Sequence, residues 1–166
     1  MEKISIIGCP GSGKSYLAKA LKEILNIKTY YLDILYWREN WDHVPKEELK
    51  ETILNIMLTN DSFIMDGNYI NSMEDRFIHS DTIIFLDMPL RVCLKGVRER
   101  RNIKREDFPE FLFEEEDLEF TTYIKNFKRD QRKTILKLIK KYRDKNIIIF
   151  KRRKDVDKFI SSLKNK

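Results

Sequence analysis

The residues best suited to chemistry stand near the start of the chain, directly after the short apolar run of residues 3–7. Gly8, Gly13, Lys14 and Ser15 occupy the fixed positions of the pattern G-x-x-x-x-G-K-[ST]. Glycines let the backbone curl so that successive N–H groups point at the oxygens of one phosphate group. The pattern therefore predicts a phosphate-binding loop, with contacts expected from Gly8, Gly11, Ser12, Gly13, Lys14, Ser15 and Tyr16.

The two residues that close this loop have separate tasks in phosphate chemistry. Lys14 would place a positive charge at the β- and γ-phosphates of a nucleotide, and the Ser15 hydroxyl can ligate Mg²⁺. The simpler alternative is a glycine-rich turn between a strand and a helix, but such a turn does not require a Lys-Ser pair. Apolar residues at positions 17, 21, 24 and 25 predict an amphipathic helix behind the loop, whose N-terminus would attract an anion.

Two aspartates stand at the ends of the next two predicted strands, residues 28–32 and residues 62–66. Ligands of parallel α/β sheets bind at the carboxyl ends of the strands. Asp33 could there accept a proton from a nucleophile or hold a metal-bound water, although a helix cap or a turn is the alternative for this residue. Asp66 could hold the water shell of Mg²⁺.

An aromatic segment that contains Tyr36, Trp37, Arg38 and Trp41 follows Asp33. Aromatic faces and an arginine could grip a planar or phosphorylated acceptor, or the segment could simply form a cap that packs on the sheet. Residues 36–60 are assigned to the acceptor side of the site. The acceptor contacts that we expect are Asp33, Tyr36, Trp37, Arg38, Asn68 and Arg76, with a surface ion pair to Glu74 or Asp75 as the simpler alternative for Arg76.

Residues 102–117 interrupt the helical pattern with a proline, several phenylalanines and the acidic run of residues 114–117. Arginines stand at both flanks, and Arg100 and Arg101 lead into the segment. We therefore expect a lid, extending to about residue 130, that closes over phosphate and excludes water. The alternative is a helical hairpin with a solvated acidic tip.

Short apolar runs alternate with amphipathic stretches along the whole chain. Strands are expected at residues 3–7, 28–32, 62–66, 82–87 and 146–150, and further helices at residues 45–60, 90–101, 118–142 and 155–163. This alternation is typical of a parallel sheet with right-handed crossovers. With 166 residues and no linker-like stretch, the chain is expected to form one domain.

The composition limits the classes of partner. The net charge of +6 suits a polyanion, but acidic and basic residues are mixed along the chain, which is typical of a solvated surface. The basic residues 151–154 could bind nucleic acid, but this alternative is not favoured, because no DNA-reading helix and no array of stacking aromatic residues accompanies them.

Two distant cysteines predict neither a disulfide framework nor a metal cluster. We expect a cytoplasmic protein without a membrane partner, either a monomer or a weak dimer.

Several motifs together resemble the bacterial topology modulation protein family, which belongs to the adenylate-kinase-like group of phosphate-loop kinases. They are the phosphate loop, residues 32–37, residues 66–69, residues 82–89, the Arg100-Arg101 pair, residues 126–127 and Arg132. The resemblance implies an α/β fold of the three-layer P-loop NTPase type. In this fold a five-stranded parallel sheet in the order 2-3-1-4-5 has helices on both faces and a lid insertion.

The resemblance also implies roles for individual residues. Gly13, Lys14 and Ser15 would hold ATP and Mg²⁺, and Asp66 matches the Asp-Gly pair at the end of the third strand in adenylate kinases. Arg100, Arg101 and Arg132 would stabilise negative charge on the transferring phosphoryl group, and Arg100 would also contact the nucleotide. Adenylate kinases carry Thr-Gly-Asp in the monophosphate site, whereas this chain has Tyr-Leu-Asp33 followed by aromatic residues, so AMP is not the favoured acceptor.

These observations predict a phosphotransferase that uses ATP and Mg²⁺ and acts on a nucleoside monophosphate or another small molecule. The residues expected to carry the catalysis are Lys14, Asp33, Arg100, Arg101 and Arg132. The alternative function is an ATP-hydrolysing regulatory protein or DNA-associated switch, in which hydrolysis moves the lid.

Overall fold

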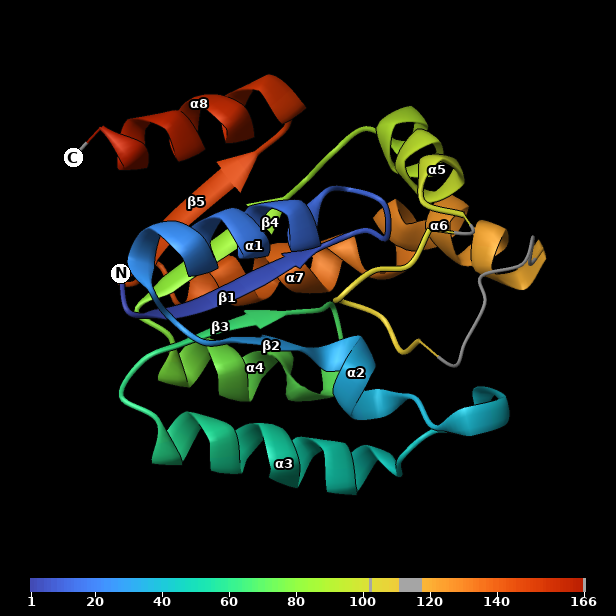
Figure 1. Cartoon of the computed structure of the whole chain (residues 1–166), viewed down its shortest axis with the longest axis horizontal. Coiled ribbons are helices and arrows are strands. Elements are labelled where there is room, and N and C mark those ends of the chain that lie inside the picture. The colour runs from blue at the N-terminus through green and yellow to red at the C-terminus, as the bar shows by residue number, and fades with distance from the viewer. Residues whose placement is uncertain (102, 111–117, 166) are drawn as a thin grey trace.

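A parallel five-stranded sheet in the order β2-β3-β1-β4-β5 forms the centre of the molecule (Figure 1). The computed structural model describes residues 1–101, 103–110 and 118–165. The strands are β1 (Lys3–Gly8), β2 (Thr29–Tyr31), β3 (Phe63–Asp66), β4 (Thr82–Leu86) and β5 (Asn146–Phe150). The strand order and the parallel pairing confirm the predicted P-loop NTPase architecture.

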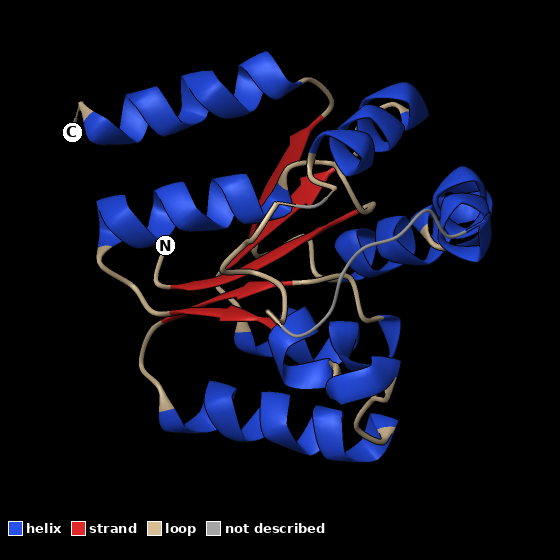
Figure 2. Ribbon diagram, turned by 45° about the vertical axis from the view of Figure 1, so that its right-hand side comes forward, coloured by secondary structure: helices blue, strands red, loops and turns tan. Residues whose placement is uncertain are grey.

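Helices cover both faces of this sheet. They are α1 (Lys14–Leu25), α2 (Leu32–Tyr36), α3 (Lys46–Thr59), α4 (Ile70–His79), α5 (Leu90–Glu99), α6 (Leu118–Asp130), α7 (Arg132–Lys141) and α8 (Arg153–Lys164), with a 3-10 turn at Glu39–Trp41. α1 and α8 lie on one face, and α3, α4 and α7 lie on the other (Figure 2). None of the described helices has both the length and the apolar character that crossing a bilayer requires.

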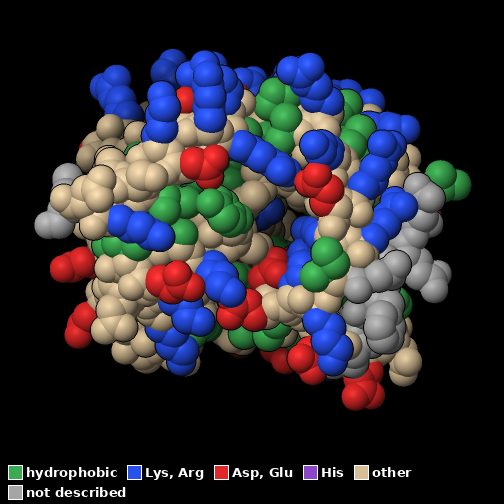
Figure 3. Space-filling view, turned by 45° about the horizontal axis from the view of Figure 1, so that its top comes forward, with side chains coloured by type: hydrophobic (Ala, Val, Ile, Leu, Met, Phe, Trp, Pro, Cys, Tyr) green, Lys and Arg blue, Asp and Glu red, His purple; other side chains and the backbone are tan. Residues whose placement is uncertain are grey.

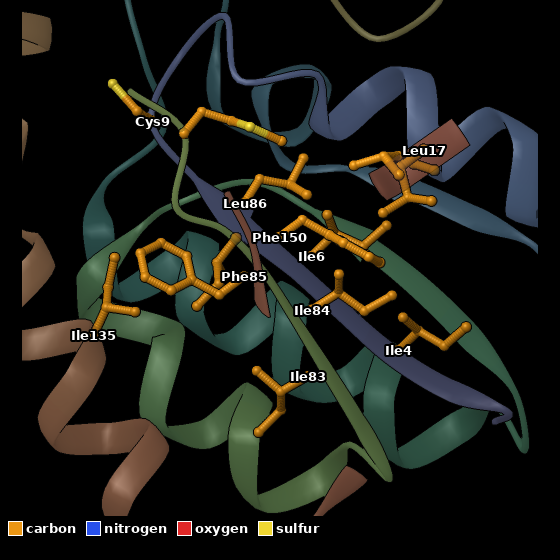
Figure 4. Packing of buried hydrophobic residues seen from close by; sticks show 14 of the residues in the cluster. Ile4, Ile6, Cys9, Leu17, Ile83, Ile84, Phe85, Leu86, Ile135 and Phe150 are labelled. Atoms are coloured by element: carbon orange, nitrogen blue, oxygen red, sulfur yellow. The ribbon is translucent and has the colours of Figure 1, made fainter. Parts of the chain in front are cut away.

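The core consists of two clusters of buried apolar side chains. The larger one surrounds β1 and β4, with Leu17 of α1 on one side and Ile135 of α7 on the other (Figure 4). The smaller cluster joins α3 to β2 and β3 through residues such as Ile53 and Phe63. The central strands are covered on both faces, which explains why their sequences are nearly continuous apolar runs.

The structure differs from the sequence prediction in three places. β2 ends at Tyr31, so Asp33 lies in the first turn of α2 rather than directly behind a strand. α4 was not predicted, because its apolar residues repeat at helical spacing over only 10 residues. The helix expected at residues 118–142 is two helices, α6 and α7, which meet at Gln131. Arg132, the first residue of α7, forms an ion pair with Asp87, the residue that follows β4 by one position.

α5 approaches the phosphate loop unusually closely. A Cβ added to Gly96 would lie 2.3 Å from the carbonyl oxygen of Gly11, and a Cβ added to Gly11 would lie 2.1 Å from the carbonyl oxygen of Cys93. Gly11 also has a φ of 74°, a region that favours glycine. The shape of the loop therefore depends on the absence of side chains on both sides of this contact.

The substitution Gly96→Ala tests that contact. Alanine favours a helix by about 1 kcal/mol over glycine, but overpacking costs about 1 to 3 kcal/mol. We expect a net decrease of about 1 to 2 kcal/mol in the free energy of unfolding, measured by urea denaturation followed by circular dichroism. Lys95→Ala, at an exposed position of the same helix, is the control and should change it by less than about 0.5 kcal/mol. A Gly96→Ala protein as stable as the wild type would contradict the tight contact.

Candidate active site

The phosphate loop forms a closed turn between β1 and α1. The Ser12 N–H donates to the Cys9 carbonyl at 3.1 Å, and the Leu17 N–H donates to the Gly13 carbonyl at 3.1 Å. The Lys14 ammonium curls back over the loop and donates to the Cys9 carbonyl at 3.4 Å. The loop stands directly before the N-terminus of a 12-residue helix, where backbone N–H groups and the helix dipole attract anions.

Asp66 lies beside the loop because β3 pairs with β1, and its carboxylate Oδ2 accepts a hydrogen bond from the Ser15 hydroxyl at 2.6 Å. The other carboxylate oxygen, Oδ1, is buried without a hydrogen-bond partner. Burial raises the pKa of Asp66 to about 6, against the opposing effects of Lys14 and the Ser15 hydrogen bond. A buried carboxylate with a free oxygen next to a serine hydroxyl is an oxygen-ligand pair suited to Mg²⁺.

Asp33 is held by a tyrosine that the sequence analysis did not single out. The Tyr69 phenol donates a hydrogen bond to Asp33 Oδ1 at 2.6 Å. Burial, followed by the neighbouring Asp33 carboxylate, raises the pKa of Tyr69 well above its ordinary value, so the phenol stays protonated and continues to donate. The signal in the sequence was the position of Tyr69, three residues after the strand-end Asp66 in the segment Asp-Gly-Asn-Tyr.

A set of ring side chains adjoins Asp33, and we call it the aromatic cap. Its members are Tyr36, Trp37, Trp41, His43, Tyr69 and Phe108. Tyr36 stacks on His43 with ring centroids 4.9 Å apart and lies 5.1 Å from the ring of Tyr69. Trp37 contacts Trp41 at 5.4 Å, and Trp41 reaches Phe108 at 6.0 Å. The aromatic cap therefore connects the acceptor-side segment with the residues that precede the predicted acidic tip.

Two cavities meet at the phosphate loop. The first, of about 1250 Å³, is lined by residues that include Asp33, Tyr36, Trp37, Asp66, Asn68 and Tyr69. The second, of about 810 Å³, is lined by residues that include Gly11, Ser12, Gly13, Tyr16, Arg105 and Arg153. The residues common to both linings are Lys14, Ser15, Arg100 and Asp107. The structure thus brings together most of the predicted site residues, on two sides of a shared centre.

Four of the predicted arginines line neither of these cavities. Arg38 forms an exposed ion pair with Glu48 at 3.1 Å, and Arg132 forms a bidentate ion pair with Asp87 at 2.8 Å for both contacts. Arg101 also lies outside both linings, as does Arg76. Arg38 and Arg132 are thus engaged by carboxylates, and the acceptor contact of Arg38 and the phosphate contacts of Arg101 and Arg132 stay predictions.

Arg76 corrects both sequence interpretations of that residue. Its side chain is fully buried, and its guanidinium donates to the backbone carbonyls of Gly67 at 2.9 Å, Asn68 at 3.3 Å and Tyr69 at 3.3 Å. It therefore neither reaches an acceptor in the cavity nor pairs at the surface. Glu74 instead binds Lys141 and Tyr142, and Asp75 binds Lys50.

Residues 103–107 of the predicted lid line the second cavity together with residues of the phosphate loop. Arg105 forms an ion pair with Asp107 at 3.3 Å and lies 5.1 Å from the ring centroid of Phe108. Glu106 pairs with Lys19 at 3.2 Å, which ties this segment to α1. Residue 102 and residues 111–117, which include the acidic run of residues 114–117, lie outside the described residues.

The basic residues 151–154 are partly used inside the fold. Arg152 forms an ion pair with Asp155 at 2.7 Å, and Arg153 donates to the Gly11 carbonyl at 3.3 Å and pairs with Glu99. Lys and Arg side chains gather along one edge of the face shown in Figure 3, with Asp and Glu side chains beside them. Two of the four basic residues thus support the loop and α8.

Comparison with known proteins shows the fold. No protein-family model and no curated protein matches the chain. Three similar solved structures are a deoxyadenosine kinase from M. mycoides with bound dATP, a shikimate kinase from Bacteroides thetaiotaomicron, and a shikimate kinase from Acinetobacter baumannii in complex with shikimate. Their TM-scores are 0.51, 0.57 and 0.61, and their sequence identities are 16%, 18% and 14%. The chain has the P-loop kinase fold.

These matches extend over whole chains. The alignments cover 98%, 98% and 100% of this chain, and 97%, 96% and 95% of the respective neighbours. At these identities the likeness establishes the architecture and leaves the substrate to be argued from the site.

The raised pKa of Asp66 predicts a pH-dependent stability. Between pH 3.8, the ordinary pKa of an aspartate, and about pH 6, the folded protein binds this proton more tightly than the unfolded chain does. The carboxyl group therefore destabilises the folded state as pH rises through that window. Asp66→Asn removes the ionisation. We expect it to raise the free energy of unfolding by up to about 3 kcal/mol near pH 7.5 and by about half as much near pH 5.

Denaturant unfolding at both pH values measures this effect. Asp61→Asn, at an exposed position, is the matched control and should leave the free energy of unfolding nearly unchanged at either pH. An Asp66→Asn protein that is less stable than the wild type at pH 7.5 would show that the carboxylate contributes net stability.

The placement of Arg76 predicts a structural role. Lysine keeps the charge but cannot bridge three carbonyls, so Arg76→Lys should lower the free energy of unfolding by about 2 to 4 kcal/mol. Arg91→Lys, at an exposed position of α5, should change it by less than about 0.5 kcal/mol. Unchanged stability in Arg76→Lys together with a raised KM for the acceptor would restore the anion-binding interpretation.

Proposed function

We propose that this protein is a phosphotransferase that moves the γ-phosphoryl group of ATP, in the presence of Mg²⁺, to a small-molecule acceptor. The observation that carries the proposal is the pair of cavities that meet at Lys14, Ser15, Arg100 and Asp107. A kinase must hold a nucleotide and an acceptor on opposite sides of the transferring group. The phosphate loop lies where the two sides join.

The second cavity is the nucleotide side in this proposal. The loop backbone would hold the phosphates, and Tyr16 and Arg153 stand at the part of the cavity formed by α1 and α8. Arg100, the residue that follows α5, faces both cavities and would stabilise charge on the transferring group. The deoxyadenosine kinase neighbour binds dATP, which supports a nucleotide ligand for this fold.

Ser15 and Asp66 would hold Mg²⁺. The Asp66 Oδ1 atom is buried without a partner, so an oxygen-seeking cation or its water shell would satisfy it. The described residues contain no cluster of three or more His, Cys, Asp and Glu side chains that could hold a metal. Mg²⁺ in phosphate complexes takes one or two carboxylates together with phosphate oxygens, so the Ser15–Asp66 pair is sufficient. The bound ion would neutralise charge on the phosphates.

Asp33 is the proposed general base on the acceptor side. It lines the first cavity together with Lys14, and Tyr69 fixes one of its oxygens. Phosphoryl transfer depends mainly on positioning and charge stabilisation, and a carboxylate here would orient the acceptor hydroxyl and take its proton. The sequence resemblance to the topology modulation family, which is adenylate-kinase-like, supports the same reaction class.

Lys14→Met tests the proposal. Incubation with γ-labelled ATP, Mg²⁺ and a panel of acceptors should yield a phosphorylated product with the wild-type protein. Lys14→Met should lower the transfer rate by at least about 100-fold, which corresponds to about 3 kcal/mol of transition-state stabilisation. Lys133→Met, at an exposed position of α7, is the control and should keep wild-type activity.

The outcomes also separate the two candidate functions. Hydrolysis of ATP with transfer to none of the acceptors, together with salt-dependent retention on DNA, would favour the regulatory switch. Phosphorylation of an acceptor without retention on DNA at low salt would exclude it.

A further inference from the structure

We infer that the acceptor is an uncharged alcohol that carries a flat aromatic ring, the chemistry of a nucleoside, and that Tyr69 positions Asp33 to receive its hydroxyl. This inference rests on the proposed phosphotransferase function and specifies its acceptor. Three features of the first cavity support it: the carboxylates around Asp33, the aromatic walls and an unsatisfied amide oxygen.

The charges on the acceptor side are unfavourable for an anionic acceptor. Asp33, Asp66 and Asp107 all line the first cavity. Arg38 and Arg76, the arginines expected to grip an acceptor anion, are engaged with Glu48 and with backbone carbonyls. A monophosphate or carboxylate acceptor would therefore lie next to carboxylates without a guanidinium from either of these residues. A neutral alcohol avoids that repulsion.

The basic residues that line the first cavity do not change this conclusion. Lys14 and Arg100 belong to the shared centre, so their charges serve the nucleotide and the transferring phosphoryl group. Lys50 is paired with Asp75 at 3.1 Å, and Lys46 is an exposed residue at the start of α3. Flexible, exposed ammonium groups bind an anion less specifically than the planar fork of an arginine.

The walls of the cavity are shaped for a ring. Tyr36, Trp37, Trp41 and Phe108 line it, and successive members contact one another at centroid distances of 4.8, 5.4 and 6.0 Å. An aromatic ligand stacks on such faces and loses few hydrogen bonds on leaving water. The faces of these rings offer no hydrogen-bond partner to the hydroxyl groups of a polyol, which would have to reach polar lining residues such as Asn71 and Ser72 instead.

One amide oxygen of a residue that lines the first cavity lacks a hydrogen-bond partner. The Asn68 side-chain N–H donates to Gln131 Oε1 at 3.4 Å, whereas Asn68 Oδ1 is buried without a hydrogen bond. Both residues line the first cavity. An unsatisfied buried acceptor requires a donor, and the amino or ring N–H group of a nucleobase supplies one. The amide oxygen thus adds a hydrogen-bond requirement to the ring-shaped walls.

Tyr69 is the positioning residue in this arrangement. Its phenol fixes Oδ1 of Asp33 at 2.6 Å, and its own carbonyl is held by the buried Arg76. No other hydrogen bond to the Asp33 side chain exists in the described part of the chain. Oδ2 is therefore the oxygen left to meet the acceptor, and the chain Arg76, Tyr69, Asp33 sets where it points.

The reaction then balances as follows. The acceptor O–H bond breaks, and its proton passes to the Asp33 carboxylate. The acceptor oxygen forms a bond to the γ-phosphorus of ATP while the bond from that phosphorus to the β–γ bridging oxygen breaks. The bridging oxygen leaves with the electron pair as part of ADP, and the product is a phosphate monoester of the alcohol.

Binding can be tested without catalysis, because the two tryptophans of the chain, Trp37 and Trp41, both line the first cavity. Titration with purine and pyrimidine nucleosides should quench the intrinsic fluorescence. The 5′-monophosphates of the same nucleosides and shikimate should quench it at least about tenfold less effectively by Kd. Equal or tighter binding of the monophosphates or of shikimate would overturn the inference.

The transfer assay uses the same compounds with labelled ATP and Mg²⁺. We expect at least one nucleoside to accept phosphate at least about 100-fold faster, by kcat/KM, than its monophosphate or shikimate does. Preferred transfer to a monophosphate or to shikimate would overturn the inference and leave the phosphotransferase function intact. Transfer to none of the compounds tested would remove the proposed function, and the inference with it.

Two matched variants test the positioning role. Tyr69→Phe and Tyr142→Phe each remove a phenol that donates to a carboxylate, Asp33 in one case and Glu74 in the other. Tyr69→Phe should lower kcat by about 10- to 100-fold and leave the KM for ATP unchanged, whereas Tyr142→Phe should change neither. Equal effects of the two variants, or a change in the KM for ATP alone, would show that Tyr69 does not act through Asp33.

Discussion

The hydrogen bond between the Ser15 hydroxyl and the Asp66 carboxylate joins the start of α1 to the end of a strand 51 residues further along the chain. A carboxylate in a buried position is unfavourable unless nearby groups compensate it. Here the compensation comes from Ser15 and Lys14, the two residues that define the phosphate loop. The register of β3 against β1 and the conformation of the loop are therefore linked energetically. The buried Asp66 carboxylate thus lowers the stability of the folded state at the position where the proposed reaction uses it to hold Mg²⁺.

A second buried charge, the Arg76 guanidinium, stabilises the fold instead of serving the site directly. The Arg76 guanidinium satisfies three carbonyls in the turn after β3, a place where regular sheet hydrogen bonding has ended. Burial lowers the pKa of this guanidinium to about 10, so it stays charged at neutral pH. A charge that would bind an anion if exposed instead makes a turn rigid. The same turn contains Asn68 and Tyr69, both of which line the first cavity.

The sequence predicted the parts of the site that are local in the chain. The phosphate loop has a fixed pattern, and the strand ends that carry Asp66 follow from continuous apolar runs. The strand order came from family resemblance rather than from the runs themselves. The errors concern contacts between distant residues. The sequence around Arg76 gives no sign that its side chain is buried. The burial arises because the fold places the backbone carbonyls of residues 67–69 against the guanidinium, and no spacing rule predicts that contact.

The same reason explains two further differences. The partner of Asp33 is Tyr69, which lies 36 residues away, so only the tertiary structure shows that a phenol fixes this carboxylate. The helix expected at residues 118–142 is divided at Gln131, next to Arg132, whose ion-pair partner Asp87 lies 45 positions away. Local periodicity in residues 118–142 gives no sign of that contact, and it therefore favours one continuous helix.

The shared lining of the two cavities has a thermodynamic consequence. Binding in one cavity can change the affinity of the other cavity for its ligand. The residues that would transmit this coupling most directly are the four that line both cavities, Lys14, Ser15, Arg100 and Asp107. The remaining lining residues belong to one side alone. Under the proposed function, most contacts of each substrate would come from one cavity alone, which predicts a random rather than a compulsory order of addition. The reciprocal effect of each substrate on the affinity for the other measures how strongly the shared centre links them.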